Sequence, residues 1–196
     1  MGMDKQLKFI HITKTAGTSI EDVAIENGIE WGRFHHEYGW WHEVFPIKPN
    51  YLKEKYDWFM VVRNPYTRIL SEFHCQWGGV GNNANKFTKQ LFNDYLIHRI
   101  NDCHTPFYWG NGPKVGKHYT PQHEYLDNSY DINVLKMERL SSDFDSLMKL
   151  YGLNIKLDKK VNTTNKIFGL DDMSNKLKDL IKKTYEKDFE LFNYDI

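Results

Sequence analysis

An apolar run, followed at once by a loop of small residues and then by an amphipathic segment, constrains the fold of this chain most. Residues 8–12 (Lys-Phe-Ile-His-Ile) are rich in the aromatic and β-branched side chains that favour a strand. Residues 13–19 are mostly small, and residues 20–27 carry apolar side chains at helical spacing before Gly28, which can end a helix. The opening of the sequence therefore predicts a strand, a tight loop and a helix.

The same succession recurs at residues 58–62, a second apolar run that ends at Arg63. Asn64 is a good N-cap, and Pro65 suits the first helical position because its missing N–H costs nothing there. We therefore predict a second strand, and a helix that continues to about Trp77, before the glycines that follow it.

The rest of the chain keeps alternating between helical and strand patterns. We expect helices over residues 87–100, 144–151 and 173–192, a strand over 132–137, and a capping box at Ser142 and Asp145. Between them, residues 103–121 form a long loop, and loops of that length are usually functional or mobile. The alternation predicts an α/β fold with a central, mainly parallel sheet flanked by helices. No repeat or linker divides the chain, so residues 1–196 are predicted to be one domain.

Composition excludes several classes of function. The 196 residues carry 26 basic and 26 acidic side chains, and this neutral balance argues against nucleic acid as a partner. No apolar run approaches the roughly 18 residues that span a bilayer, and residues 1–8 contain no apolar signal core. Two cysteines are too few for a disulfide framework. A cytoplasmic protein without a membrane span is the prediction, and the oligomeric state cannot be deduced.

Residues 14–19 (Lys-Thr-Ala-Gly-Thr-Ser) are the first segment with chemical meaning. A helix N-terminus presents unpaired N–H groups and a partial positive charge, so it suits a phosphate. Gly17 lets the backbone approach a ligand closely, and the hydroxyls of Thr18 and Ser19 add donors. Lys14 adds a cation that can meet the negative charge developing on a leaving group. The alternative is a plain strand-to-helix turn with a capping hydroxyl.

This loop is not the ordinary nucleoside-triphosphate loop. That motif places Gly-Lys-Ser/Thr after an earlier glycine, whereas here Lys14 precedes Gly17. Nor does an acidic residue at a strand end offer an evident magnesium ligand. A nucleotide kinase or NTPase therefore stays an alternative reading.

Residues 63–71 (Arg-Asn-Pro-Tyr-Thr-Arg-Ile-Leu-Ser) are the second such segment. Ligands of open parallel sheets collect beyond the carboxyl ends of the strands, where Arg63 is expected. Ser71 lies two turns along the following helix on nearly the same face, so the pair could hold one phosphate. Arg68 is expected to point elsewhere, into a carboxylate pair. Two phosphate-holding elements at neighbouring strand ends predict a ligand with two separate phosphate groups.

The two segments resemble the 5′-phosphosulfate loop and the 3′-phosphate motif of sulfotransferases that use 3′-phosphoadenosine 5′-phosphosulfate (PAPS). The first family motif reads Pro-Lys-Thr-Ala/Gly-Gly-Thr-Ser, and this chain departs from it with Thr13 in place of proline. The second, Arg-Asn-Pro-x-x-Arg-x-x-Ser, is matched fully from Arg63 to Ser71. Both similarities imply the P-loop-like nucleotide-binding architecture of that family.

The resemblance continues towards the carbohydrate-type branch of the family. Residues 118–126 resemble its His-x-x-Pro-Gln-x-x-Tyr-Leu segment, and residues 138–144 resemble its Glu-x-Leu-x-x-Asp-Phe element. Residues 162–165 are similar to its Asn-rich loop, and residues 185–192 to its closing Tyr-x-x-Asp-Phe-x-x-Phe. The resemblance thus spans nearly the whole chain, which would be a small prokaryotic or viral form, and it implies sulfuryl transfer to an acceptor hydroxyl, with a carbohydrate favoured.

The resemblance also implies roles for residues. Lys14 would supply charge at the bridging oxygen, and Arg63 with Ser71 would hold the 3′-phosphate. The 5′-phosphate of PAPS, or of its product 3′,5′-diphosphoadenosine (PAP), would be held by Thr15, Ala16, Gly17, Thr18 and Ser19. Sulfuryl transfer needs no metal, and His74, Cys75, Cys103 and His104 lack the close cysteine pair of a zinc site, so none is expected.

A general base is still required, and histidine is the usual choice near neutral pH. The family places its base between the two phosphate motifs, where His42 follows two tryptophans that could line a sugar site. We therefore predict His42 as the base, and the alternatives are His35, His36, Glu37 and Glu43.

Other candidate contacts belong to the acceptor. His36, Trp41, His118 and Gln122 are predicted to bind it. A non-catalytic module that binds PAP, PAPS or a sulfated glycan is a further reading, although the presence of Lys14 argues against it. A protein tyrosine, a lipid or a small metabolite could replace the carbohydrate as acceptor.

Overall fold

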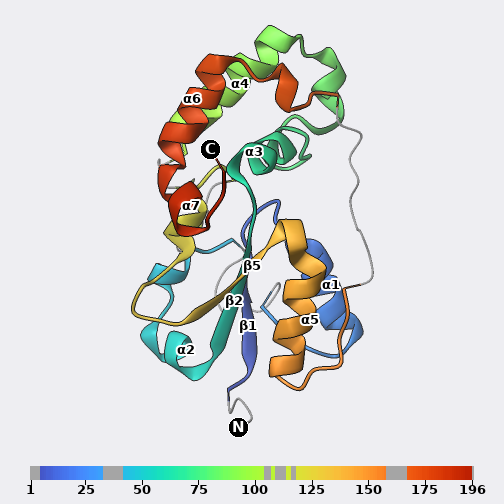
Figure 1. Cartoon of the computed structure of the whole chain (residues 1–196), viewed down its shortest axis with the longest axis vertical. Helices are drawn as coiled ribbons and strands as arrows, with labels where there is room; N and C mark the ends of the chain where they lie inside the picture. Colours follow the sequence, from blue (N-terminus) through green and yellow to red (C-terminus); the bar gives the residue numbers. More distant parts are fainter. Residues whose placement is uncertain are drawn as a thin grey trace.

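A three-stranded parallel sheet forms the centre of the molecule (Figure 1). The computed structural model describes residues 5–32, 42–103, 118–157 and 167–195, with the backbone of 107–108 and 114–115. The strands are β1 (Leu7–Ile10), β2 (Asp57–Val62) and β5 (Ile132–Lys136), in the order β1-β2-β5. All pairs are parallel, with Phe9 opposite Phe59 and Met60 opposite Val134. The predicted α/β fold with a parallel sheet is confirmed.

Helices cover both faces of this sheet because alternate strand residues point to opposite sides. On one face, Phe9, Phe59 and Leu135 pack against α1 (Gly17–Glu26) and α5 (Leu140–Leu150). On the other face, Ile10, Trp58 and Met60 pack near α2 (Asn50–Lys55) and the single turn Phe45–Ile47. The central strand β2 is buried almost along its whole length, which agrees with its continuous apolar sequence.

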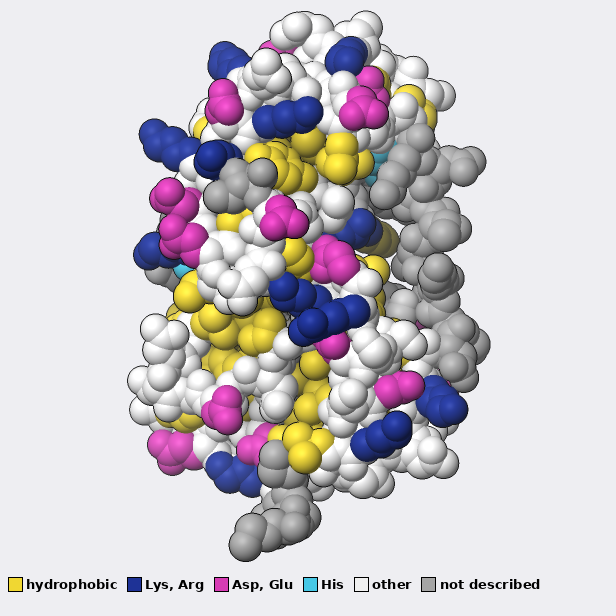
Figure 2. Space-filling view, in the orientation of Figure 1, with side chains coloured by type: hydrophobic (Ala, Val, Ile, Leu, Met, Phe, Trp, Pro, Cys, Tyr) yellow, Lys and Arg dark blue, Asp and Glu magenta, His cyan; other side chains and the backbone are white. Residues whose placement is uncertain are grey.

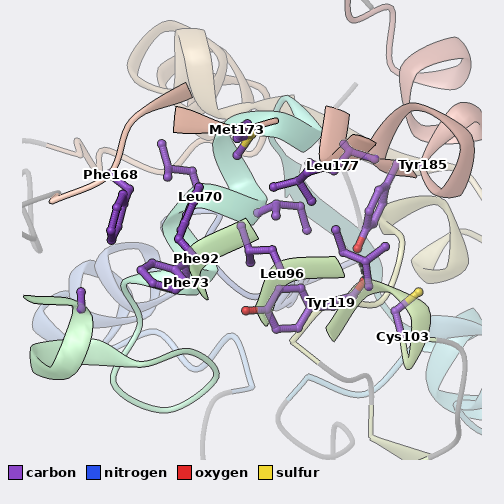
Figure 3. Packing of buried hydrophobic residues seen from close by; sticks show 14 of the residues in the cluster. Leu70, Phe73, Phe92, Leu96, Cys103, Tyr119, Phe168, Met173, Leu177 and Tyr185 are labelled. Atoms are coloured by element: carbon purple, nitrogen blue, oxygen red, sulfur yellow. Dashed lines mark hydrogen bonds between the residues drawn. The ribbon is translucent and has the colours of Figure 1, made fainter. Parts of the chain in front are cut away.

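A helical layer lies beyond the carboxyl ends of the strands (Figure 1). It consists of α3 (Pro65–Phe73), α4 (Lys89–Asn101), α6 (Asn175–Thr184) and α7 (Glu186–Leu191). These helices enclose their own apolar cluster, in which the rings of Phe73, Phe92 and Phe168 lie together (Figure 3). Tyr185 fixes the neighbouring loop to this cluster by donating a hydrogen bond of 2.6 Å to the carbonyl oxygen of Tyr119. The layer therefore closes the edge of the sheet where the predicted site residues emerge.

Helix α3 ends at Phe73, four residues before the predicted end at Trp77. The chain turns back immediately, because the Val80 amide donates to the Phe73 carbonyl oxygen at 2.8 Å. A Cβ atom at Gly79 would meet the Glu72 carbonyl oxygen at 2.0 Å, so only glycine permits this close return. The glycines therefore shape the turn that follows the helix, and the helix itself ends before them.

Two other helix predictions were wrong in detail. Helix α5 begins at Leu140, so Ser142 lies inside the helix rather than at its N-cap. The predicted helix over 173–192 is divided into α6 and α7 at Tyr185, after an N-cap at Ser174 whose side chain accepts from the Leu177 amide. The long loop contains a small antiparallel pair, β3 (Phe107–Tyr108) and β4 (Lys114–Val115). Further short 3₁₀ helices cover Gly81–Lys86, Gln122–Tyr125, Met137–Arg139 and Leu170–Asp172.

Basic and acidic side chains are interspersed over the face seen in Figure 2, with hydrophobic side chains between them. This mixed distribution matches the neutral net charge of the sequence. Within the described ranges, no helix is both long and apolar enough to cross a bilayer.

Candidate active site

The loop after β1 wraps around the start of α1 through two residues in the left-handed conformation. Lys14 has φ 60° and Ala16, the N-cap of α1, has φ 64°. The Thr15 hydroxyl donates to the Ile12 carbonyl oxygen at 2.9 Å, so this buried side chain braces the loop from inside. The first-turn amides from Gly17 to Ser19 have no partner within the helix and are available to an anion.

Gly17 is required here for steric reasons. A Cβ atom at this position would lie 2.1 Å from Nε2 of His11, whose ring therefore packs directly beneath the loop. Nδ1 of His11 lies 3.2 Å from a carboxylate oxygen of Glu21, and both side chains are buried. The loop thus rests on a buried histidine–carboxylate pair.

The loop is joined to the start of α3 by Arg63. The Arg63 guanidinium donates to the Lys14 carbonyl oxygen at 3.2 Å and to the Thr67 hydroxyl at 3.0 Å. Burial lowers the pKa of Arg63, and the nearby carboxylate of Glu138 partly offsets that effect. The two segments predicted to hold phosphates are therefore in direct contact.

Gln122 holds the main chain of Arg63. Its side-chain oxygen accepts from the Arg63 amide at 2.8 Å, and its side-chain nitrogen donates to the Arg63 carbonyl oxygen at 2.8 Å. Gln122 is fully buried, and its own amide donates to Asp188 at 2.8 Å. The structure thus places this predicted acceptor contact beneath the Arg63 backbone. Ser71 lies half-buried two turns further along α3.

Arg68 does not enter a carboxylate pair, contrary to the sequence interpretation. It is almost completely buried and donates to the carbonyl oxygens of Thr13, His118 and Thr120 at 3.1, 3.0 and 2.9 Å. It also donates to the Thr13 hydroxyl at 3.1 Å. One side chain of α3 therefore fixes both the loop after β1 and the segment that begins at His118.

His42 lies above this loop. Its Nδ1 is 3.1 Å from the His11 carbonyl oxygen, and its ring meets the His11 ring edge-on at 4.5 Å between centroids. Desolvation lowers the pKa of His42 to about 3, and the neighbouring His11 contributes to the shift. A neutral ring that donates from Nδ1 to the carbonyl oxygen leaves a lone pair on Nε2.

His118 lies beside His42, with 5.9 Å between ring centroids. Its Nδ1 is 2.9 Å from a carboxylate oxygen of Glu72, which is fully buried. The other oxygen of Glu72 accepts the Thr13 hydroxyl. The sequence interpretation did not include Glu72, because on its own it resembles a solvated helix residue. The threonine at position 13, where the family motif has proline, was the only local signal.

Five further predicted residues remain to be considered. His35, His36, Glu37 and Trp41 lie outside the described residues. Glu43, an alternative base, is buried and accepts a hydrogen bond of 2.7 Å from Lys48. Its carboxylate is thus already compensated by a cation.

Glu72, Cys75 and His118 offer ligand atoms within 4.8 Å of one another, and no other such group occurs in the part of the chain that is described. Both Glu72 oxygens already accept hydrogen bonds, from Thr13 and His118. The Arg68 guanidinium donates to the Thr13 hydroxyl, which in turn donates to Glu72. Its positive charge therefore lies close to these ligand atoms and disfavours a bound cation. The geometry therefore favours a hydrogen-bonded array over a metal centre.

The model of the sulfotransferase family matches residues 2–195, nearly the entire chain. This chain belongs to the sulfotransferase family. The match fits the parallel sheet and the arginine-bridged loop and helix start, which are the elements that the sequence motifs predicted. Neither the curated proteins nor the solved structures gave a match to this sulfotransferase. Family membership supports transfer of a sulfuryl group to a hydroxyl-bearing acceptor.

Proposed function

We propose that this sulfotransferase moves a sulfuryl group from PAPS to a hydroxyl group of a carbohydrate. The observation that carries the proposal is the hydrogen bond between Arg63 and the Lys14 carbonyl oxygen, which joins the two segments predicted to bind phosphates at one sheet edge. A donor with two separated phosphates fits two such elements, whereas adenosine 5′-phosphate would use only one.

The first-turn amides and hydroxyls from Gly17 to Ser19 would bind the 5′-phosphosulfate, and Thr15 and Ala16 would shape the loop around it. Arg63 and Ser71 would bind the 3′-phosphate, with Gln122 holding the arginine in place. Charge-assisted hydrogen bonds from a guanidinium give this second contact most of its strength.

Sulfuryl transfer, like phosphoryl transfer, passes through a loose transition state and depends mainly on positioning and charge. Lys14 would neutralise the charge that develops on the departing phosphate oxygen. A histidine of the group at the loop would take the proton of the acceptor hydroxyl, and His42 is the candidate from sequence. Its low pKa keeps it neutral, and the negative charge of bound PAPS would raise that pKa.

A carbohydrate acceptor is supported by Trp77. This side chain is 85% exposed, which is unusual for the largest aromatic residue. It precedes Gly78, on which the His118 ring packs, since a Cβ there would lie 2.1 Å from Nδ1 of His118. An exposed aromatic face on the residue next to that contact is suited to stacking against a sugar ring.

Thermal unfolding with different nucleotides tests the donor. PAP should raise the melting temperature, whereas adenosine 5′-phosphate and ATP with magnesium should have little effect. A ligand at about 100 times its dissociation constant adds about 2.7 kcal/mol to the free energy of unfolding. Stabilisation by ATP with magnesium but not by PAP would refute the proposal and favour a kinase.

Transfer itself is tested with ³⁵S-labelled PAPS and a panel of neutral and acidic polysaccharides. Label should appear in at least one polysaccharide, and Lys14→Ala should abolish most of it while PAP still binds. Binding of PAP without transfer to any acceptor or to water would instead indicate a non-catalytic binding module.

A further inference from the structure

The pairing between His118 and Glu72 has the geometry of an oriented base. An ionised carboxylate can only accept, so the Nδ1–Oε2 distance of 2.9 Å indicates that Nδ1 of His118 carries the hydrogen. The lone pair is then on Nε2, which has no hydrogen-bond partner among the described residues. A buried carboxylate that holds one ring nitrogen fixes the tautomer and stabilises the imidazolium that forms when the other nitrogen is protonated.

His118 is also accessible, unlike its carboxylate partner. Its side chain is 27% exposed, whereas that of Glu72 is fully buried. The His118 atoms nearest to a Cβ built on Gly78 are Nδ1, Cγ and Cε1, so Nε2 lies outside that close contact. A substrate hydroxyl can therefore approach the nitrogen that bears the lone pair.

His42 is less suited to the same task. Desolvation lowers its pKa to about 3, which leaves it a weak acceptor of protons before any donor binds. Its Nδ1 faces the neutral carbonyl oxygen of His11, whereas Nδ1 of His118 lies at hydrogen-bond distance from the carboxylate of Glu72.

Thr13 connects this pair to the donor loop. Its hydroxyl donates to the second oxygen of Glu72 and accepts from Arg68, so the carboxylate is held at both oxygens. Thr13 directly precedes Lys14 in the chain. The residue that anchors the carboxylate is thus the neighbour of the residue predicted to stabilise the leaving group.

We propose that His118 is the general base of this sulfotransferase and that Glu72, held by Thr13, is its positioning residue. The proposal rests on the proposed transfer from PAPS and replaces the sequence-based choice of His42. His42, beside the His118 ring, would act as a neutral hydrogen-bonding wall of the acceptor site.

The chemical step balances without any further reactant. The acceptor O–H bond breaks and its proton moves to Nε2 of His118, while the acceptor oxygen forms a bond to sulfur. The bond between sulfur and the bridging oxygen breaks, and its electron pair stays on the 5′-phosphate of PAP. The imidazolium of His118 then releases its proton to water, which yields a sulfate ester, PAP and one proton.

Among the described residues, four titratable or charged side chains lie near His118. Glu72 and Arg68 come from α3, Cys75 from the turn after it, and His42 from across the loop. The Glu72 carboxylate is at hydrogen-bond distance from Nδ1 of the ring, whereas the Arg68 guanidinium donates to the main chain of His118. The pH dependence of the rate is therefore sensitive to removal of Glu72.

The test compares His118→Ala with His42→Ala in ³⁵S transfer, using a polysaccharide that the wild-type protein sulfates, or water if none is sulfated. Removing a general base lowers the rate by about 10²–10⁴-fold, so we expect that loss in kcat for His118→Ala and less than about tenfold for His42→Ala. PAP affinity and the melting temperature with PAP should stay near wild type, which shows that the variant folds. Free imidazole should restore part of the activity of His118→Ala.

Glu72→Gln tests the positioning role through the pH–rate profile. Without the carboxylate, the acid limb of kcat/KM should move to lower pH, and kcat should fall; a purely structural role would leave that limb in place. Wild-type-like kcat in His118→Ala, or loss in His42→Ala alone, would overturn the proposal while PAP binding and transfer by the wild-type protein persist. Absence of both PAP binding and transfer in the wild-type protein would instead refute the proposed function.

Discussion

The loop after β1 and the helix start after β2 lie at the same edge of one sheet, yet they are held in different ways. The first is shaped by its main chain, with left-handed residues at Lys14 and Ala16 and a glycine pressed onto His11. The second depends on side chains, because Arg63 is held by Gln122 and by the Thr67 hydroxyl. We call the loop the main-chain element and the helix start the side-chain element. The main-chain element should tolerate most side-chain substitutions but no change of its backbone conformation. The side-chain element should instead be sensitive to substitution of its side chains.

Lys14→Ala should have the largest effect, because the lysine ammonium is the one side-chain charge of the main-chain element. Loss of a group that stabilises the leaving oxygen costs about 10²–10³-fold in kcat. Single-turnover ³⁵S transfer measures this loss, and PAP titration should show only a small change in affinity. The exposed Lys176 on α6 provides the control, because Lys176→Ala should leave both quantities unchanged. An equal loss in affinity and rate would show that Lys14 acts in binding.

Arg63→Ala should have the next largest effect, on affinity rather than on rate. A hydrogen bond to a charged group contributes about 1.5–3 kcal/mol, so the dissociation constant of PAP should rise about 10–100-fold. Isothermal titration calorimetry measures it, with adenosine 5′-phosphate as the ligand that lacks the 3′-phosphate. Affinity for that ligand should not change, nor should PAP affinity in the control Arg139→Ala, which removes an exposed arginine. Equal weakening for both ligands would show that Arg63 does not recognise the 3′-phosphate.

Gly17→Ala should destabilise the protein, because the new methyl group would meet the His11 ring. Overpacking of this kind typically costs about 1–3 kcal/mol, measured by urea unfolding. Gly169→Ala is the control, since a Cβ there meets only a carboxylate oxygen at 4.0 Å. Wild-type stability and PAP affinity in Gly17→Ala would show that the loop is not constrained by the ring beneath it.

His42→Asn should have the smallest effect at neutral pH, because its influence on stability is confined to acid. The pKa of His42 is lowered from 6.5 to about 3, so between these pH values the unfolded chain binds the additional proton. Because the unfolded chain takes up this proton and the folded chain does not, the free energy of unfolding falls by up to about 1.4 kcal/mol for each pH unit of acidification. Asparagine tolerates the left-handed backbone, at φ 61°, and does not titrate. Urea unfolding between pH 4 and 7 should therefore show a shallower decline for the variant, and identical slopes would contradict the buried neutral histidine.

The parts of the fold that sequence predicted are local ones. The strands at residues 7–10 and 57–62, the loop between β1 and α1, and the start of α3 at Asn64 follow from apolar runs, small residues and a capping side chain. The break at Tyr185 could not be predicted, because apolar residues continue at helical spacing through it.

The candidate site was predictable only where a motif carried it. The roles of Lys14 and Arg63 came from contiguous motifs. The contact between Thr13 and Glu72 spans 59 residues, and that between Glu72 and His118 spans 46. Such contacts depend on how α3 crosses the sheet edge, which no local pattern encodes.

Arg68 couples two segments of the molecule mechanically. Because one planar guanidinium donates hydrogen bonds to Thr13, His118 and Thr120, the loop after β1 and the segment that carries His118 cannot shift independently. A displacement of the loop at Thr13 would therefore also displace the main chain of His118. If the loop binds the sulfuryl donor and His118 receives the proton of the acceptor, as we propose, this one side chain makes the position of the base depend on whether the donor is bound.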